Sequence, residues 1–297
     1  MDSTEDRLVR YYRGFNEWRR LGLDPYHRLE FETTLYFLRK YLPQGGLLLD
    51  AGGGPGRYAI ELARVGYEVV LLDLMPEHLR VARRQIRRAG VQGKVRELHQ
   101  GSIEDLSRFG DESFDGVLCL GGALGHLVNQ TQRRRALREL ARVAKPRAPV
   151  FLSVIGRFSV MVGELTEYSE ELENAPEIVR QICRTGDYDG SRGFAPSHFF
   201  LLEQLQREVR ASHLRVLESV GLEGLASRHP REANRLARDH PRRWKVWEEL
   251  HRLTCTQPPI VAMSEHFMVI ARKPRARKDS DDQELGTRSV GARRRGG

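Results

Sequence analysis

Short apolar runs alternate with amphipathic stretches between residues 47 and 155, and this alternation constrains the fold more than any other feature of the chain. Helical spacing is clear in one stretch, where arginines fill the face opposite Leu79, Ala82 and Ile86. Repeated strand–helix units of this kind predict a parallel sheet whose strands are buried on both faces. The runs with the length of strands are Leu47–Ala51, Glu68–Asp73, Lys94–His99, Phe114–Leu120 and Val150–Ile155.

The segments around this core have different patterns. Residues 1–46 predict one or two helices that cover the sheet's carboxyl edge, and residues 156–197 lose periodicity, which is typical of an inserted lid. Residues 198–273 predict a helix capped by Ser197 and two last strands, Leu214–Val220 and His266–Ala271. Residues 274–297 predict a disordered tail. The expected fold is α/β, a doubly wound seven-stranded sheet with an N-terminal helical cover and a lid.

The most informative motif follows the first predicted strand and reads Asp50-Ala51-Gly52-Gly53-Gly54-Pro55-Gly56. Glycine is favoured where the backbone needs a positive φ or must touch a ligand. The loop lies outside the carboxyl end of a central strand, where open α/β sheets bind ligands. A dinucleotide fingerprint would need a further glycine, but the chain has Arg57 or Tyr58 at that position.

An acid ends the second predicted strand, because Asp73 stands 17 residues after Gly56. Its carboxylate can accept hydrogen bonds from both hydroxyls of a ribose, so the residue indicates a nucleoside. The structural alternative is that Asp73 caps the following helix. After the third strand, Ser102 offers a hydroxyl either to an adenine amino group or to the start of a helix over Ile103–Arg108.

The pattern Asp50-x-Gly52-x-Gly54-x-Gly56 followed by Asp73 resembles class I S-adenosylmethionine-dependent methyltransferases. The resemblance implies a Rossmann-like sheet, S-adenosyl-L-methionine as methyl donor, and residues 47–155 as the cofactor-binding core. It also places His126 near the transferred methyl group. The cofactor contacts that it implies within this core are Asp50, Gly52, Gly53, Gly54, Gly56, Asp73, Leu74, Ser102, Ile103, Leu120 and Gly121.

A general base is optional for methyl transfer, because the protein mainly aligns acceptor and methyl group and excludes water. His126 is the candidate, since an imidazole titrates near pH 7. Its structural alternative is packing at the start of a helix. The other histidines form no ligand constellation, so no metal site is predicted.

The acceptor is harder to predict. The ending around Cys255-Thr256-Gln257-Pro258-Pro259 resembles bacterial tRNA methyltransferases that esterify wobble carboxymethoxyuridine, although an acid and a tyrosine of that group are missing. This resemblance implies an arginine near the cofactor carboxylate, for which Arg28 is the nearest match. We expect a small-molecule acceptor. The alternatives are a modified tRNA uridine and a cofactor-binding regulator without catalysis. The acceptor would be enclosed by aromatic and basic residues, with candidates Tyr11, Tyr12, Trp18, Arg28, Arg157 and Tyr188.

Charge and cysteine content limit the partners. The net charge is +9, but residues 1–271 hold 40 Lys and Arg against 36 Asp and Glu, whereas residues 272–297 hold 9 against 4. Much of the excess therefore belongs to the predicted tail, and it is weak support for a nucleic-acid partner. Three scattered cysteines and no apolar leader predict a reduced, cytoplasmic protein that does not span a membrane. The sequence leaves the oligomeric state open.

Overall fold

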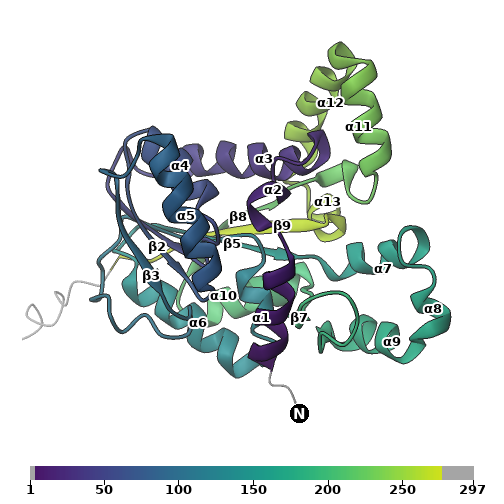
Figure 1. Ribbon diagram of the computed structural model, residues 1–297, viewed down its shortest axis with the longest axis horizontal. Helices are drawn as coiled ribbons and strands as arrows, with labels where there is room; N and C mark the ends of the chain where they lie inside the picture. Colours follow the sequence, from purple (N-terminus) through teal and green to yellow (C-terminus); the bar gives the residue numbers. More distant parts are fainter. Residues whose placement is uncertain (1–3, 276–297) are drawn as a thin grey trace, which may run out of the picture.

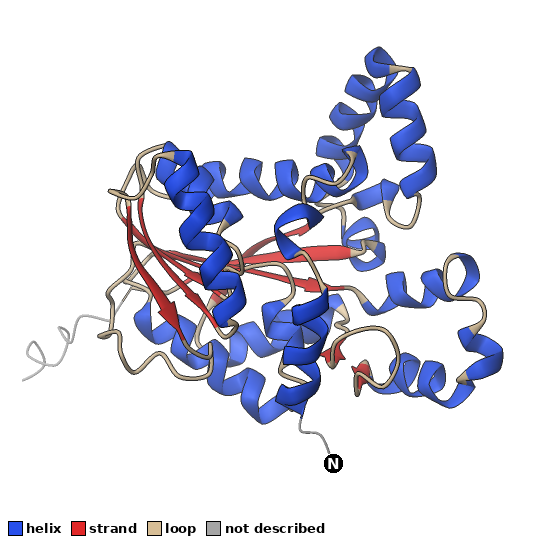
Figure 2. Ribbon diagram, viewed as in Figure 1, coloured by secondary structure: helices blue, strands red, loops and turns tan. Residues whose placement is uncertain are grey.

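A seven-stranded sheet forms the centre of the computed structural model, which describes residues 4–275 (Figures 1 and 2). The strand order is β3-β2-β1-β4-β5-β9-β8. Strands β1 to β5 pair in parallel, and β9 runs antiparallel between β5 and β8. The predicted seven-stranded doubly wound sheet is therefore confirmed. The strands are β1 (Leu47–Ala51), β2 (Glu68–Asp73), β3 (Val95–Gln100), β4 (Gly116–Cys119), β5 (Pro149–Ile155), β8 (Arg215–Gly221) and β9 (His266–Arg272).

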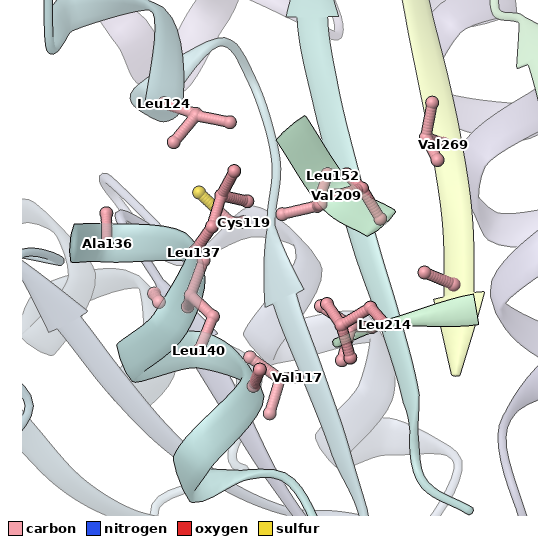
Figure 3. Packing of buried hydrophobic residues seen from close by; sticks show 14 of the residues in the cluster. Val117, Cys119, Leu124, Ala136, Leu137, Leu140, Leu152, Val209, Leu214 and Val269 are labelled. Atoms are coloured by element: carbon pink, nitrogen blue, oxygen red, sulfur yellow. The ribbon is translucent and has the colours of Figure 1, made fainter. Parts of the chain in front are cut away.

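Helices cover both faces of the sheet and bury it as the apolar runs require. One face packs against α3 (Pro25–Tyr41), α4 (Arg57–Arg64) and α5 (Pro76–Ala89). The other packs against α6 (Gln130–Val143) and α10 (Leu202–Ala211). Figure 3 shows this second interface, where Cys119 of β4 lies among leucines and valines. Burial raises the pKa of the Cys119 thiol to about 12, so this cysteine is a packing residue.

Helix α5 illustrates how local sequence sets the helix bounds. Pro76 occupies the first turn, where its missing N–H costs nothing, and Gly90 ends the helix in the left-handed conformation. Leu79, Ala82 and Ile86 are buried against the sheet. Burying such aliphatic side chains stabilises the fold by roughly 1.5–3 kcal/mol for each larger residue.

The segments outside the core differ most from expectation. Residues 4–46 form three helices, α1 (Thr4–Gly14), α2 (Glu17–Arg20) and α3, rather than one or two. Residues 156–197 are mostly helical rather than irregular, because short amphipathic helices separated by Pro and Gly escape a search for long periodicity. Their elements are α7 (Arg157–Thr166), α8 (Glu171–Asn174), α9 (Pro176–Thr185) and the paired strands β6 (Asp187–Tyr188) and β7 (Ser197–His198).

Two further expectations in the C-terminal part are corrected or lie outside the described residues. Ser197 does not cap a helix, because it lies in β7 and α10 begins only after Leu201. The predicted tail falls, apart from Pro274 and Arg275, outside the described residues. No helix within residues 4–275 is both long and apolar enough to cross a membrane. The remaining elements are η1 (Ala123–His126), η2 (Gly224–Ala226), the projecting pair α11 (Pro230–Asp239) and α12 (Pro241–Thr254), and α13 (Pro258–Met263) (Figure 1).

Candidate cofactor and acceptor site

The sheet reverses its winding between β1 and β4, and the loops that leave the carboxyl ends of β1 to β4 line one cavity. A crevice at such a switch point is where doubly wound sheets bind ligands. Helices α1 and α2 close this cavity from the opposite side through Leu8, Tyr12, Glu17 and Arg20. We call it the cofactor cavity.

The glycine loop after β1 leaves no room for side chains. Gly52 has φ +75°, and a Cβ there would lie 2.5 Å from the Cβ of Ala123. Gly56 has φ +82° and caps α4, and a Cβ would lie 3.0 Å from Leu71 Cδ1. Gly52, Gly53 and Gly54 line the cofactor cavity, whereas Gly56 does not. The sequence assigned Gly56 to the cofactor, and the structure places it at the start of α4, where its missing side chain leaves room for Leu71 of β2 and Ala82 of α5.

Asp50 is the most unusual group in this cavity. It is fully buried, and neither carboxylate oxygen has a hydrogen-bond partner among the described residues. Burial, and then the charge of Asp73, raises the pKa of the Asp50 carboxyl to about 7. A buried polar group without partners is costly, and such groups mark places where a ligand supplies the missing donor.

Asp73 already accepts several hydrogen bonds. Its Oδ2 accepts from the Gly54 N–H at 2.7 Å, and its Oδ1 accepts from the Met75 N–H at 2.9 Å and from His78 Nδ1 at 3.1 Å. Asp73 therefore fixes the turn before α5 and lines the cavity, but it accepts no backbone N–H from the first turn of that helix, so the alternative of a helix cap is not met. Since a carboxylate has about four lone-pair sites, one remains for a ligand rather than the two expected.

His78 was missed by the sequence reasoning. It stands in the first turns of α5, lines the cofactor cavity, and its Nε2 is buried without a partner among the described residues. Burial lowers the pKa of this imidazole, but the hydrogen bond to Asp73 and the Asp73 charge outweigh it, so the pKa is raised. The one available signal was a histidine five residues after the acid of β2.

The loops after β3 and β4 supply the rest of the wall. The Ser102 hydroxyl accepts the Glu104 N–H at 3.2 Å in a turn, so no helix follows over Ile103–Arg108 as one alternative required. Gly121 has φ +66°, and its N–H donates to Ser153 Oγ at 2.8 Å. Of the predicted site residues, those that line the cavity are Asp50, Gly52, Gly53, Gly54, Asp73, Leu74, Ser102, Ile103, Leu120, Gly121 and His126.

Arg28 is not at the site. It lies on the outer face of α3, with 63% of its side chain exposed, and pairs with Glu32 at 3.4 Å. Arg20 is the N-terminal arginine that reaches the cofactor cavity. Its guanidinium donates to Glu17 at 2.8 Å and to both oxygens of Glu30, the nearer at 2.5 Å. The expectation for Arg28 is therefore not met, because Arg28 faces solvent on α3, whereas Arg20 comes from the separate short helix α2.

A larger cavity of about 730 Å³ adjoins the first one, between the N-terminal helices and residues 155–199. We call it the acceptor cavity. Its wall shares with the cofactor cavity the residues Tyr12, Glu17, Arg20, Gly121 and His126. These residues therefore mark the boundary where a ligand in one cavity would meet a ligand in the other.

A tyrosine–histidine pair stands at that boundary. The Tyr12 hydroxyl lies 2.7 Å from His126 Nε2, and His126 Nδ1 lies 3.0 Å from the Pro196 carbonyl oxygen. A carbonyl only accepts, so Nδ1 carries the proton and Nε2 accepts from the Tyr12 hydroxyl. Burial lowers the pKa of His126 and raises that of Tyr12, so both are neutral near pH 7.

Buried charges gather at the far side of the acceptor cavity. Oxygens of Glu30 and Glu223 and a nitrogen of His266 all lie within 4.8 Å of one another, a spacing that could hold a metal ion. His266 Nδ1 lies 2.8 Å from Glu223 Oε1 and 3.7 Å from Glu30 Oε2. Although burial opposes its charge, Glu30 and Glu223 raise the pKa of His266 to about 9. The imidazole is then protonated, and the three groups form an ion-pair cluster that includes Arg20.

The other residues expected around the acceptor divide into two groups. Tyr11 and Tyr188 join Tyr12 in the wall of the acceptor cavity. Trp18 instead lies against the Arg57 guanidinium, whose carbon is 4.5 Å from the ring centroid. Arg157 binds backbone carbonyls, with a 2.7 Å hydrogen bond to that of Thr185, and holds α7 to the end of α9.

Comparison with known proteins agrees with this site. Residues 48–147 match the family model described as a methyltransferase domain. Among curated proteins, a ubiquinone biosynthesis O-methyltransferase of Xanthomonas axonopodis pv. citri is 35% identical over 133 residues, which are 45% of this chain and 53% of that protein. A counterpart in Xanthomonas euvesicatoria pv. vesicatoria is 35% identical over 130 residues. The chain thus spans about half the length of the curated relatives it matches.

Solved structures share the fold at low sequence identity. A methyltransferase from Methanosarcina mazei has TM-score 0.55 and 21% identity, with 80% of this chain and 97% of that chain covered. The 1,6-didemethyltoxoflavin-N1-methyltransferase of Burkholderia thailandensis has TM-score 0.52 and 16% identity, with 91% and 87% covered. The chain thus has the Rossmann-like fold of these solved methyltransferases. Within it, residues 48–147 are the part that matches a methyltransferase domain.

Proposed function

We propose that this chain is an S-adenosylmethionine-dependent methyltransferase that methylates a small molecule held in the acceptor cavity. The observation that carries the proposal is the contact between the two cavities at Tyr12, Gly121 and His126. The names of the curated relatives and the size of the acceptor cavity, about 730 Å³, support a small acceptor and do not favour a tRNA or a binding-only role.

The residues of the cofactor cavity fit S-adenosylmethionine. Asp50, buried without a partner among the described residues, suits the cofactor's ammonium group, and the glycine loop leaves backbone space beside it. Asp73 suits a ribose hydroxyl, and Ser102 and Ile103 would border the adenine. When bound, the cofactor supplies a methyl group on a positively charged sulfur, which is open to in-line displacement.

His78 complements Asp73 in this assignment. Because its Nδ1 faces Asp73, its partnerless Nε2 is the nitrogen left for a ligand in the same wall. The one lone-pair site left on Asp73 and the free Nε2 together serve two ribose hydroxyls. The acid and the histidine would therefore share a task that sequence reasoning gave to the acid alone.

The Tyr12–His126 pair provides a route for the acceptor's proton. The Tyr12 hydroxyl donates to His126, so its oxygen lone pairs remain for a hydroxyl or amine of the acceptor. When an acceptor hydroxyl or amine at this boundary takes the methyl group and the methyl–sulfur bond breaks, the acceptor's proton would pass to the Tyr12 oxygen and the Tyr12 proton to His126 Nε2. Nδ1 keeps its own proton on the Pro196 carbonyl and holds the ring in this orientation.

The proposal is tested by following labelled methyl groups. The purified protein is incubated with methyl-tritiated S-adenosylmethionine and either a low-molecular-weight cell extract or bulk tRNA. We expect label in the extract and none in the tRNA, together with micromolar binding of S-adenosylhomocysteine by calorimetry. Label in tRNA would show that the acceptor is a tRNA and overturn the small-molecule proposal. Cofactor binding without transfer to either pool would instead support a regulator that binds the cofactor without catalysis.

Tyr12→Phe tests the proton route on the acceptor found in that assay. Losing the hydroxyl should lower kcat by about 100-fold, in the range for general acid–base groups, while S-adenosylhomocysteine affinity stays within about two-fold. Tyr67→Phe is the control, because that exposed hydroxyl only donates to the Pro43 carbonyl. An unchanged kcat and pH profile in Tyr12→Phe would exclude the phenol from proton transfer.

A further inference from the structure

The acceptor cavity contains more carboxylates than cations. Its three arginines are Arg20, Arg192 and Arg228, and His266 adds a fourth positive charge. Six carboxylates line the same wall, two more than these cations. They are Glu17, Glu30, Glu164, Glu171, Glu223 and Glu265.

The cations are already engaged. Arg20 pairs with Glu17 and Glu30, Arg192 lies 3.6 Å from Glu171, and Arg228 lies 3.7 Å from Glu265. His266 pairs with Glu223 at 2.8 Å. An anionic ligand would have to break one of these pairs, whereas a cationic ligand would relieve the surplus of negative charge.

Glu164 is the carboxylate that these pairs leave out. It lies on α7, its residue is only 7% exposed, and it lines the acceptor cavity. Its Oε2 is buried without a hydrogen-bond partner, and no ion pair within residues 4–275 includes it. Burial, and then Glu171, raises the pKa of this carboxyl. A partnerless buried carboxylate is stabilised by a ligand that brings a charged donor.

The neighbouring walls suit the rest of such a ligand. Tyr168 follows Glu164 by four residues and lines the same cavity. The guanidinium carbon of Arg228 lies 6.0 Å from the centroid of its ring, so this ring already packs against a cation and its remaining surface can take a second one. Ile178, Ile182 and Phe199 add an apolar wall from α9 and the segment after β7. A ligand with one positive end and an apolar body matches both surfaces.

We propose that the acceptor cavity recognises small molecules that carry an organic ammonium group, held by Glu164 beside Tyr168. That the bound molecule is the methyl acceptor rests on the function proposed above. A protonated amine has no free lone pair, so the ammonium is an anchor. The atom that is methylated is then a different one, placed at the Tyr12–His126 boundary.

Matched phenyl compounds test the charge preference. Calorimetric titrations with phenethylamine, 2-phenylethanol and 3-phenylpropionate compare a cation, a neutral molecule and an anion of similar shape. EDTA in every titration prevents a metal ion from supplying the positive charge. We expect phenethylamine to bind at least about ten-fold more tightly than the other two, which corresponds to one charge-assisted hydrogen bond. Equal binding of amine and alcohol would overturn the proposal.

Glu164→Gln removes the charge and keeps the size. We expect phenethylamine affinity to fall about ten-fold, with 2-phenylethanol and S-adenosylhomocysteine unchanged. Glu170→Gln is the matched control, since Glu170 is exposed and lies outside the cavity wall. Unchanged phenethylamine affinity in Glu164→Gln would overturn the proposal, because Glu164 is the residue that it assigns to the ammonium group. If the wild type does not bind S-adenosylhomocysteine at all, the proposed methyltransferase function is contradicted. Binding of phenethylamine through Glu164 would still be supported by its own titrations.

Discussion

The cofactor cavity and the acceptor cavity are built in different ways. The first is lined mainly by loops that directly follow β1 to β4, so its residues come from one repeated strand–loop–helix pattern. The second is assembled by contacts between distant segments, such as Arg7 with Asp189 and Tyr26 with Glu265, which are 182 and 239 residues apart. Local sequence therefore specifies the first cavity, whereas only tertiary packing specifies the second.

The two cavities also differ in whether their buried charged side chains have partners. The cofactor cavity leaves Asp50 without a partner among the described residues. Apart from Glu164, the acceptor cavity pairs its buried charges across elements, as in the Arg20–Glu30 contact between α2 and α3. Removing one of these paired charges should therefore affect folding most, whereas removing a charge in the cofactor cavity should affect binding most.

The largest effect is expected for Arg20→Gln. The variant leaves Glu30, of which only 2% is exposed, without its guanidinium, and breaking a buried pair from one side costs about 3–5 kcal/mol. Arg28→Gln should change the unfolding free energy by no more than about 0.5 kcal/mol, because its pair with Glu32 is exposed. Urea denaturation measures both. Similar midpoints for the two variants would show that Arg20 does not hold the N-terminal helices in place.

A somewhat smaller, pH-dependent effect is expected for His266→Gln. The folded protein raises the pKa of His266 from 6.5 to about 9 through Glu30 and Glu223. The stability that this charge contributes, roughly 3 kcal/mol, is therefore complete below pH 6.5 and lost as the pH rises through 9. The difference in unfolding free energy between wild type and variant should shrink over that window. A constant difference from pH 6 to 9.5 would mean that folding does not raise the pKa of His266.

The smallest of these effects is expected for Asp73→Asn, in the cofactor cavity. Losing the charge should weaken S-adenosylhomocysteine binding by about 1–3 kcal/mol in calorimetry. Asp105→Asn serves as control, since this exposed acid lies outside the cavity and accepts only from the nearby Ser107 N–H. Wild-type affinity in Asp73→Asn would refute the ribose assignment, and binding of NAD by the wild type would refute the cofactor class.

The fold was largely predictable because β1, β2 and β5 are apolar runs bounded by glycine, proline or acid. The prediction weakened where strands are short or mixed, so β4 is shorter than expected and β3 is shifted by one residue. In the site, Asp50, the glycines and Asp73 belong to one contiguous pattern. By contrast, Arg20 and His78 become recognisable only when helices dock, since many arginines and histidines of this chain lie elsewhere on helices.

Helix α1 has a consequence for how the protein folds. Its residues precede the sheet in the chain, yet Tyr12 contacts His126, which lies 114 residues later, and Arg7 contacts Asp189. During synthesis the contacts of α1 with His126 and Asp189 cannot form until residues 126 and 189 have emerged, whereas the strand–helix units can pair as they appear. Closing loops of this length is slow compared with local contacts. Completion of the boundary between the two cavities is thus a late step in folding, although the helix that provides Tyr12 is among the first parts made.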